Sequence, residues 1–213
     1  MVPVAFGLLV GAGSSTLRLV PHLGTTRVVT AGLLGLGGML ATTLLWGPDM
    51  PYWPIGLWFF LVALSMGWVM APSTASVMGS VPAEKSGVAS AMNDVTRQVG
   101  GALGVAVIGS VISTVYASRV ADDTASLPES SRVAAEDSVG QANAVAATLG
   151  GADGAGLASA AADAYTGALG IGLTVSAALA LVGALAVRRW LPGRQEPDAE
   201  LELVREEPAR EAA

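Results

Sequence analysis

The chain has 213 residues, of which 52% are hydrophobic and only 13% are charged. A soluble domain usually carries about 25% charged residues, so this chain has too few to cover a surface in water. Cysteine is absent and His22 is the single histidine, which excludes disulfides, thiol catalysis and a His-based metal site. The net charge of -6, without a basic stripe, argues against binding to nucleic acid. We expect neither a metal nor a cofactor.

Long, nearly uncharged stretches follow one another along the chain. A transmembrane helix needs about 20 mainly apolar residues, because it crosses about 30 Å of hydrocarbon at about 1.5 Å per residue. Any single stretch is also compatible with a buried helix of a soluble core, but so short a chain leaves little to shield them all from water. The predicted fold is therefore an all-α integral membrane protein with five transmembrane helices. The expected spans are about 1–17, 28–46, 55–81, 88–116 and 164–187.

Basic residues in the short loops predict how these helices are oriented. Arg18 and Arg27 lie in the first loop, Lys85 lies in the third, and Arg188 follows the fifth span. These loops and the C-terminus are expected on the cytoplasmic side of the plasma membrane, so segment 119–163 becomes an outer loop. With the C-terminus inside and five spans, the N-terminus lies outside. The first span begins almost at Met1, so we expect that earlier helices of the same protein are missing.

Three segments outside the spans complete the domain organisation. Trp46, Tyr52 and Trp53 cluster where an aromatic belt would mark the outer interface. Part of the outer loop, about 130–149, forms either an amphipathic helix on the membrane surface or a flexible solvated loop. Residues 1–190 thus make up the transmembrane region. The acidic, Pro-containing segment 191–213 is predicted to be a disordered cytoplasmic tail.

Residues 67–116 carry a combination of motifs that is more specific than any one of them. In chain order, they are Gly67 and Pro72 in one helix, Val81-Pro82, Gly87-Val88-Ala89-Ser90, and Arg97-Gln98-Val99-Gly100-Gly101 with Gly104. This combination resembles the fourteen-helix drug:proton antiporters of the major facilitator superfamily. The resemblance implies the C-terminal part of a major facilitator helix bundle. It also implies export of small, amphipathic compounds in exchange for protons by alternating access.

The first loop also resembles a motif of that superfamily. Arg18, Gly24 and Arg27 match the Arg, Gly and following basic residue of its conserved cytoplasmic loop. The acid of that motif is absent here, and Pro21 and His22 stand near its place. The resemblance implies that these residues hold two helices together at the cytoplasmic face.

A polar group at one end of the fourth span supplies the candidates for gating or the substrate pathway. The group consists of Asn93, Asp94, Arg97 and Gln98. Asp94 and Arg97 are three residues apart, so they share a helix face and can pair. Ionisable groups at membrane depth usually face a cavity or a partner, whereas at the interface the two would form a surface ion pair of little energetic value. Both interpretations remain open.

Small and soft side chains mark three of the predicted helices. The pairs Gly7/Gly11 and Gly100/Gly104, with Gly101, let helices approach closely in lipid, either as static packing or as a sliding surface for alternating access. Pro72 is expected to kink the third span. Met66 and Met70 either contact varied apolar substrates or face lipid.

The predicted function is therefore part of a secondary transporter and not an enzyme. No Ser–Lys pair, metal-ligand cluster or His–acid pair lies within the spans. The expected partners are the lipid bilayer, a small-molecule substrate, the missing N-terminal helices and, by resemblance, protons. The alternative is a truncated or degenerate membrane fragment that does not transport and serves at most as a structural partner.

Overall fold

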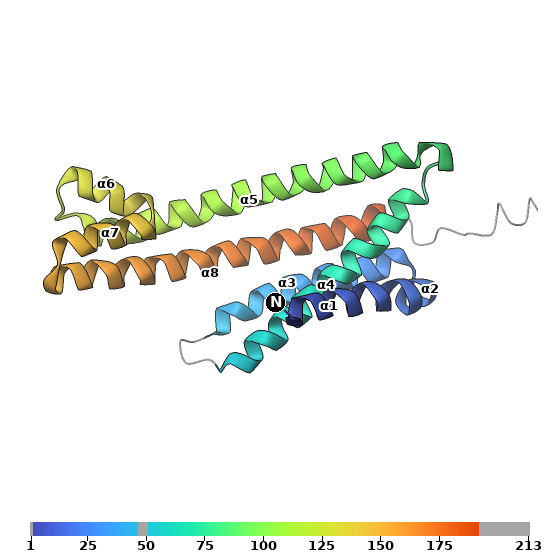
Figure 1. Ribbon diagram of the computed structural model, residues 1–213, viewed down its shortest axis with the longest axis horizontal. Coiled ribbons are helices and arrows are strands. Elements are labelled where there is room, and N and C mark those ends of the chain that lie inside the picture. Colours follow the sequence, from blue (N-terminus) through green and yellow to red (C-terminus); the bar gives the residue numbers. More distant parts are fainter. Residues whose placement is uncertain (1, 47–50, 192–213) are drawn as a thin grey trace, which may run out of the picture. The chain divides into compact units, whose positions relative to one another are not determined.

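The structure is a computed structural model that describes residues 2–46 and 51–191, and within them every regular element is a helix (Figure 1). The first half of the chain contains α1 (Val2–Ser14), a π-helical turn (Ser15–Leu19), α2 (Val20–Leu23), α3 (Thr25–Thr42), a 3-10 turn (Thr43–Leu45) and α4 (Tyr52–Met78). The second half contains a 3-10 turn (Ala83–Lys85), α5 (Ser86–Thr124), α6 (Glu129–Asp137), α7 (Val139–Leu149) and α8 (Gly151–Trp190).

Five helical stretches in the described part of the chain are long and apolar enough to cross a membrane. They are Val2–Leu23, Thr25–Leu45, Tyr52–Met78, Ala83–Thr124 and Gly151–Trp190. In each case a continuous helix satisfies its own backbone hydrogen bonds, as the hydrocarbon core requires. The prediction of an all-α fold with five membrane-length helices is confirmed.

The last two long helices extend well beyond the spans expected from hydropathy. α5 has 39 residues and α8 has 40, so each is about 60 Å long at about 1.5 Å per residue, roughly twice the hydrocarbon thickness. The expected spans 88–116 and 164–187 cover only their most apolar parts. The extension of α8 before its apolar part, residues 151–163, is rich in alanine, which favours helix whatever the surrounding hydropathy.

The expected outer loop 119–163 is consequently helical for most of its length. Its middle part forms α6 and α7, so the flexible-loop alternative for 130–149 is wrong. The alternative of one amphipathic helix over about 130–149 differs from the structure in one respect. Ser138 is extended (φ -161°) and divides the segment into two helices. The Ser138 side chain accepts a hydrogen bond from the backbone N–H of Gln141 and thereby caps α7. The predicted tail lies almost wholly outside the described residues, of which Leu191 is the last.

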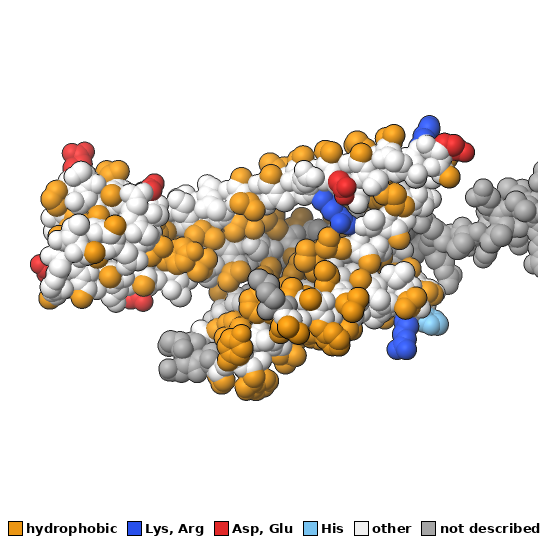
Figure 2. All heavy atoms as spheres, viewed as in Figure 1, with side chains coloured by type: hydrophobic (Ala, Val, Ile, Leu, Met, Phe, Trp, Pro, Cys, Tyr) orange, Lys and Arg blue, Asp and Glu red, His pale blue; other side chains and the backbone are white. Residues whose placement is uncertain are grey.

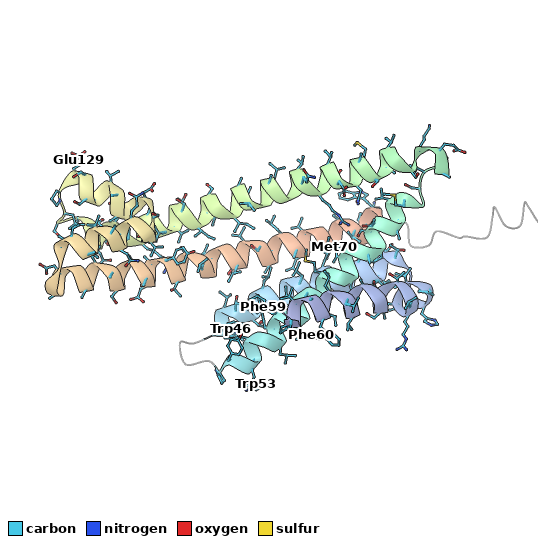
Figure 3. The ribbon with its side chains drawn as sticks, in the orientation of Figure 1. Trp46, Trp53, Phe59, Phe60, Met70 and Glu129 are labelled. Atoms are coloured by element: carbon cyan, nitrogen blue, oxygen red, sulfur yellow. The ribbon has the colours of Figure 1, made fainter. Side chains whose placement is uncertain are left out.

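The chain divides into two compact units. The first comprises the described residues of 1–35, 56–89 and 182–213. Within it, α1 runs beside α4, and the rings of Phe6 and Phe60 lie 6.0 Å apart (Figures 1 and 3). Hydrophobic side chains cover much of the face of α1 and α4 seen in Figure 2, and outward apolar side chains are what a helix in lipid presents.

The second unit comprises the described residues of 36–55 and 90–181. α5 and α8 run side by side, and α6 and α7 pack on each other at one end of the pair (Figure 1). A buried cluster joins these four helices, namely Tyr116, Val120, Ala135, Ala142, Ala161, Ala164 and Ala168. Tyr116 is its largest side chain, and its hydroxyl donates to the carbonyl oxygen of Ala135 at 2.9 Å.

Candidate functional site

Close contact between α1 and α4 is built on glycine. A Cβ atom at Gly7 would collide with the carbonyl oxygen of Phe60, and one at Gly11 with that of Leu64. From the other side, a Cβ at Gly67 would lie 2.6 Å from the backbone nitrogen of Ala12. Only glycine fits at such distances, and this is how small residues let helices associate in lipid.

A polar contact strengthens the same helix pair. The indole Nε1 of Trp68 on α4 donates to Ser14 Oγ at the end of α1, at 3.1 Å. The Ser14 hydroxyl in turn donates to the carbonyl oxygen of Gly11 at 3.2 Å. The indole N–H therefore finds an acceptor within the bundle, as a buried Trp requires in the absence of water.

The glycines predicted for packing on α5 have different surroundings. Among the described residues, no atom other than those of α5 itself and of immediate neighbours lies within 4 Å of a Cβ built at Gly100, Gly101 or Gly104. Gly100 and Gly101 are exposed and Gly104 is half-buried. Their role in helix packing stays a prediction.

The polar group of α5 lies on the same open stretch of helix. Asp94, Arg97 and Gln98 are exposed, and Asn93 is half-buried. The continuous helix places Asp94 and Arg97 on one face, as expected from their spacing. Roles in gating or in a substrate pathway stay predictions for all four residues.

The two candidate methionines lie on α4. Met66 is 46% exposed, whereas Met70, labelled in Figure 3, is half-buried. Pro72 follows within the same helix and is buried, and α4 continues past it to Met78. The expected kink at Pro72 and the contact of Met66 and Met70 with substrates stay predictions.

The loop motif falls on the turn between α2 and α3. Gly24 ends α2 with φ of 82°, a left-handed conformation that strongly favours glycine, and its N–H donates to the Val20 carbonyl at 2.9 Å. Gly24 and Arg27 line a cavity with Arg188 of α8. Arg18 lies in the exposed π-helical turn and is not among the described residues that line it. The resemblance alone did not identify Arg188 as a neighbour of this loop. The sequence signal for this proximity was the position of Arg188 at the end of the last span, on the same predicted side of the membrane as Arg27.

A buried polar contact in the second unit also went unpredicted. Thr124, fully buried at the end of α5, donates its hydroxyl to Glu136 Oε1 of α6 at 3.0 Å. This contact and the bond from Tyr116 tie α6 to α5. Hydropathy carries no signal for it, because both residues fall in a segment expected to be a loop.

The aromatic residues of the expected belt lie at the adjoining ends of α3 and α4, and their role at a membrane interface stays a prediction. Trp46 and Trp53 lie at this end in Figure 3, and Tyr52 and Trp53 are 86% and 71% exposed. Which side of the membrane this end occupies stays a prediction. Among the described residues, no three His, Cys, Asp or Glu side chains gather where they could hold a metal ion.

Comparison with known proteins places the chain beside drug-resistance transport proteins, although no protein-family model matches it. It is 33% identical over 127 residues to the tetracenomycin C resistance and export protein of Streptomyces glaucescens, covering 57% of this chain and 22% of that protein. It is 30% identical over 138 residues to the multidrug efflux pump LfrA of Mycolicibacterium smegmatis (65% and 27%). It is 28% identical over 124 residues to the puromycin resistance protein of Streptomyces alboniger (57% and 25%).

The matched region spans only about a quarter of the length of these curated relatives. Within this chain it covers more than half of the residues. The chain is thus an all-α protein with five membrane-length helices that is similar to drug and antibiotic efflux and resistance proteins.

Proposed function

We propose that this chain forms the C-terminal part of a secondary active transporter that exports small, amphipathic compounds in exchange for protons by alternating access. The observation that carries the proposal is the similarity to three efflux or resistance proteins in a chain with five membrane-length helices. The fourteen-helix major facilitator type and the coupling to protons rest on the motif resemblance of residues 67–116.

The helix contacts support a bundle that moves as a rigid body. Gly7, Gly11 and Gly67 bring α1 and α4 into backbone contact, and such tightly packed helices suit the rocking of one bundle against another. The open glycine face of α5 offers a surface to helices that precede this chain in a longer protein. Its shape favours close approach by another helix backbone.

The polar group of α5 then supplies gating or substrate contacts. Asp94 and Arg97 share one face of an exposed stretch of α5. Met66 and Met70 provide adaptable apolar contacts for varied substrates. The loop around Arg27 and the C-terminus are cytoplasmic, and the membrane is the plasma membrane. The protein acts as a carrier and not as an enzyme.

The experiment is an efflux assay on the longest open reading frame that contains this chain. Expressed in a bacterium that lacks its own major pumps, it should lower accumulation of a fluorescent amphipathic cation, and a protonophore should restore accumulation. Unchanged accumulation with the protein present in the membrane would contradict export. Efflux that continues in the presence of the protonophore would contradict the exchange for protons but not the export of the compound.

The alternative of a truncated or degenerate fragment predicts a different result. The 213-residue chain expressed alone should then insert into the membrane without lowering accumulation, and the longer reading frame should do no better. We expect the chain alone to be inactive in either case, because one part of a bundle cannot alternate around a shared site. The longer reading frame therefore decides between the two.

A further inference from the structure

A cavity of about 930 Å³ lies within the first unit, where the ends of three helices meet. The turn between α2 and α3 forms one wall, and the last turn of α8 forms another. The hydroxyl of Thr26 donates to the carbonyl oxygen of Leu191 at 3.0 Å and ties the two walls together. Residues from opposite ends of the sequence thus build one site.

The polar side of the cavity is basic. His22, Arg27 and Arg188 line it, and no Asp or Glu is among its described lining residues. Both arginines are exposed, so their guanidinium groups are accessible from outside the bundle. Two fixed cations without a lining carboxylate favour an anionic ligand, and Arg is well suited to bind phosphate through paired N–H groups.

The remaining wall is apolar and follows α3 away from the arginines. Ala31 and Leu34 line it, and Leu34 lies seven residues after Arg27, about 10 Å further along the helix at about 1.5 Å per residue. Leu34 is 49% exposed, so this wall is open to the surroundings. A ligand that fills the cavity therefore has an anionic end beside the arginines and an apolar body along α3.

The cavity also lies where two membrane-length helical stretches begin and end. Thr25 begins the membrane-length stretch Thr25–Leu45, and Trp190 ends the stretch Gly151–Trp190. Trp190 is 77% exposed, and exposed Trp and Arg at a helix end are typical of the membrane–water interface. We infer that the cavity binds an anionic phospholipid, with its phosphate between Arg27 and Arg188 and an acyl chain along Ala31 and Leu34.

Two other anions meet only part of this chemistry. Free phosphate matches the arginines but leaves the apolar wall in contact with water. The acidic segment that follows Leu191 also matches the charge, but its first large apolar residue, Leu201, comes ten residues after Leu191. A phospholipid satisfies both walls, and basic pockets between transmembrane helices are known to hold such headgroups.

The test measures lipid binding by the full chain in neutral detergent, using native mass spectrometry with phosphatidylglycerol or phosphatidylcholine as the added lipid. The wild-type chain should bind phosphatidylglycerol at least tenfold more tightly than phosphatidylcholine. Arg27→Gln together with Arg188→Gln should weaken that binding by about fivefold for each arginine, as expected for a basic residue at an anionic lipid surface. Arg27→Lys together with Arg188→Lys should retain most of it.

The matched control removes the same charge from exposed positions outside the cavity, Lys85→Gln together with Arg189→Gln. Binding within twofold of wild type supports the site, whereas a loss equal to that of the cavity variant would reduce it to general surface charge. If the double cavity variant does not fold, as judged by circular dichroism, Arg188→Gln alone gives the same test with a fivefold effect.

Two further results would overturn the proposal. Displacement of phosphatidylglycerol by excess inorganic phosphate would assign the cavity to a free anion. A tenfold gain in lipid affinity after truncation behind Leu191 would assign it to the acidic segment of the chain itself. Because the assay needs no transport, its outcome is separate from that of the efflux experiment.

Discussion

The small-residue pairs of α1 and α5 have the same spacing and opposite surroundings. Gly7 and Gly11 press against the backbone of α4, whereas Gly100 and Gly104 meet no other helix of the described part of their own unit. A pair of glycines at this spacing therefore marks a helix face that another helix backbone can approach closely, but it does not identify that other helix. In α1 the partner is part of this chain.

Large apolar side chains around the open pair strengthen the contrast. Leu103 is 62% exposed and Val105 is 76% exposed, which is unusual for a helix that a soluble bundle would bury. Such side chains suit lipid or helices contributed from elsewhere. Four predictions test this difference between α1 and α5.

The largest expected effect comes from filling the closed face. Gly11→Leu places a side chain where the backbone of Leu64 lies, so the two helices must separate. Overpacking of this kind costs about 3 kcal/mol. Titration of the chain with a denaturing detergent, followed by circular dichroism, should show this loss of unfolding free energy.

The matched control lies two residues further along the same helix. A Cβ at Gly13 meets no atom within 4 Å, so Gly13→Leu should change the unfolding free energy by about 0.5 kcal/mol or less. Equal destabilisation by both variants would mean that α1 rejects leucine as such, and that contact with α4 is not the cause.

The second prediction concerns the open face of α5. Gly104→Leu should leave the stability of this chain unchanged, because no described residue lies near enough to collide. In the proposed longer transporter the same change should lower the initial rate of drug efflux by about tenfold, or about 1.4 kcal/mol, since it blocks approach of a partner helix. Full efflux by that variant would show that this face contacts only lipid.

The third prediction tests the packed end of α5. Tyr116→Phe removes the bond from the buried hydroxyl to the Ala135 carbonyl, and loss of one such bond costs about 1 kcal/mol. Tyr165→Phe removes a hydroxyl from a residue that is 38% exposed and should cost less. A reversed order in detergent unfolding would contradict the packing of α6 on α5.

The smallest expected effect belongs to the exposed polar group. Asp94→Asn should lower efflux by the longer protein about threefold, and Asp94→Asn with Arg97→Gln should lower it no further if the two residues act as a pair. Glu84→Gln, which removes an acid before the start of α5, serves as the control. Wild-type transport by Asp94→Asn would remove that residue from the pathway.

Sequence reasoning succeeded where the physical signal is local and strong. Continuous apolar runs between charged residues predicted all the membrane-length helices, because hydrocarbon leaves few other backbone solutions. It failed where helix formation depends on propensity and on distant contacts. Residues 119–124 and 151–163 carry charges and fall in the expected outer loop, yet both are helical. Val120 and Ala161 belong to the buried cluster around Tyr116, and 151–163 is also rich in alanine.

The candidate sites show the same division. Glycine spacing identified faces suited to close packing, but only the structure shows that Gly67 completes the contact from α4. The cavity itself could not be predicted, because Arg27 lies in the first loop and Arg188 follows the last span, and membrane sidedness does not say that the two are neighbours. Their proximity depends on how α3 and α8 pack, a tertiary relation that no single-chain pattern encodes.

Labelling the two ends of α4 tests most directly whether these helices cross a bilayer. The chain has no cysteine, so Trp53→Cys and Ser80→Cys each supply one thiol, the first at the start of the 27-residue helix α4 and the second just after its end. A maleimide that cannot cross membranes should label one variant in intact cells and the other only after permeabilisation. Labelling of both in intact cells, or of neither until cells are opened, would contradict a membrane-spanning α4.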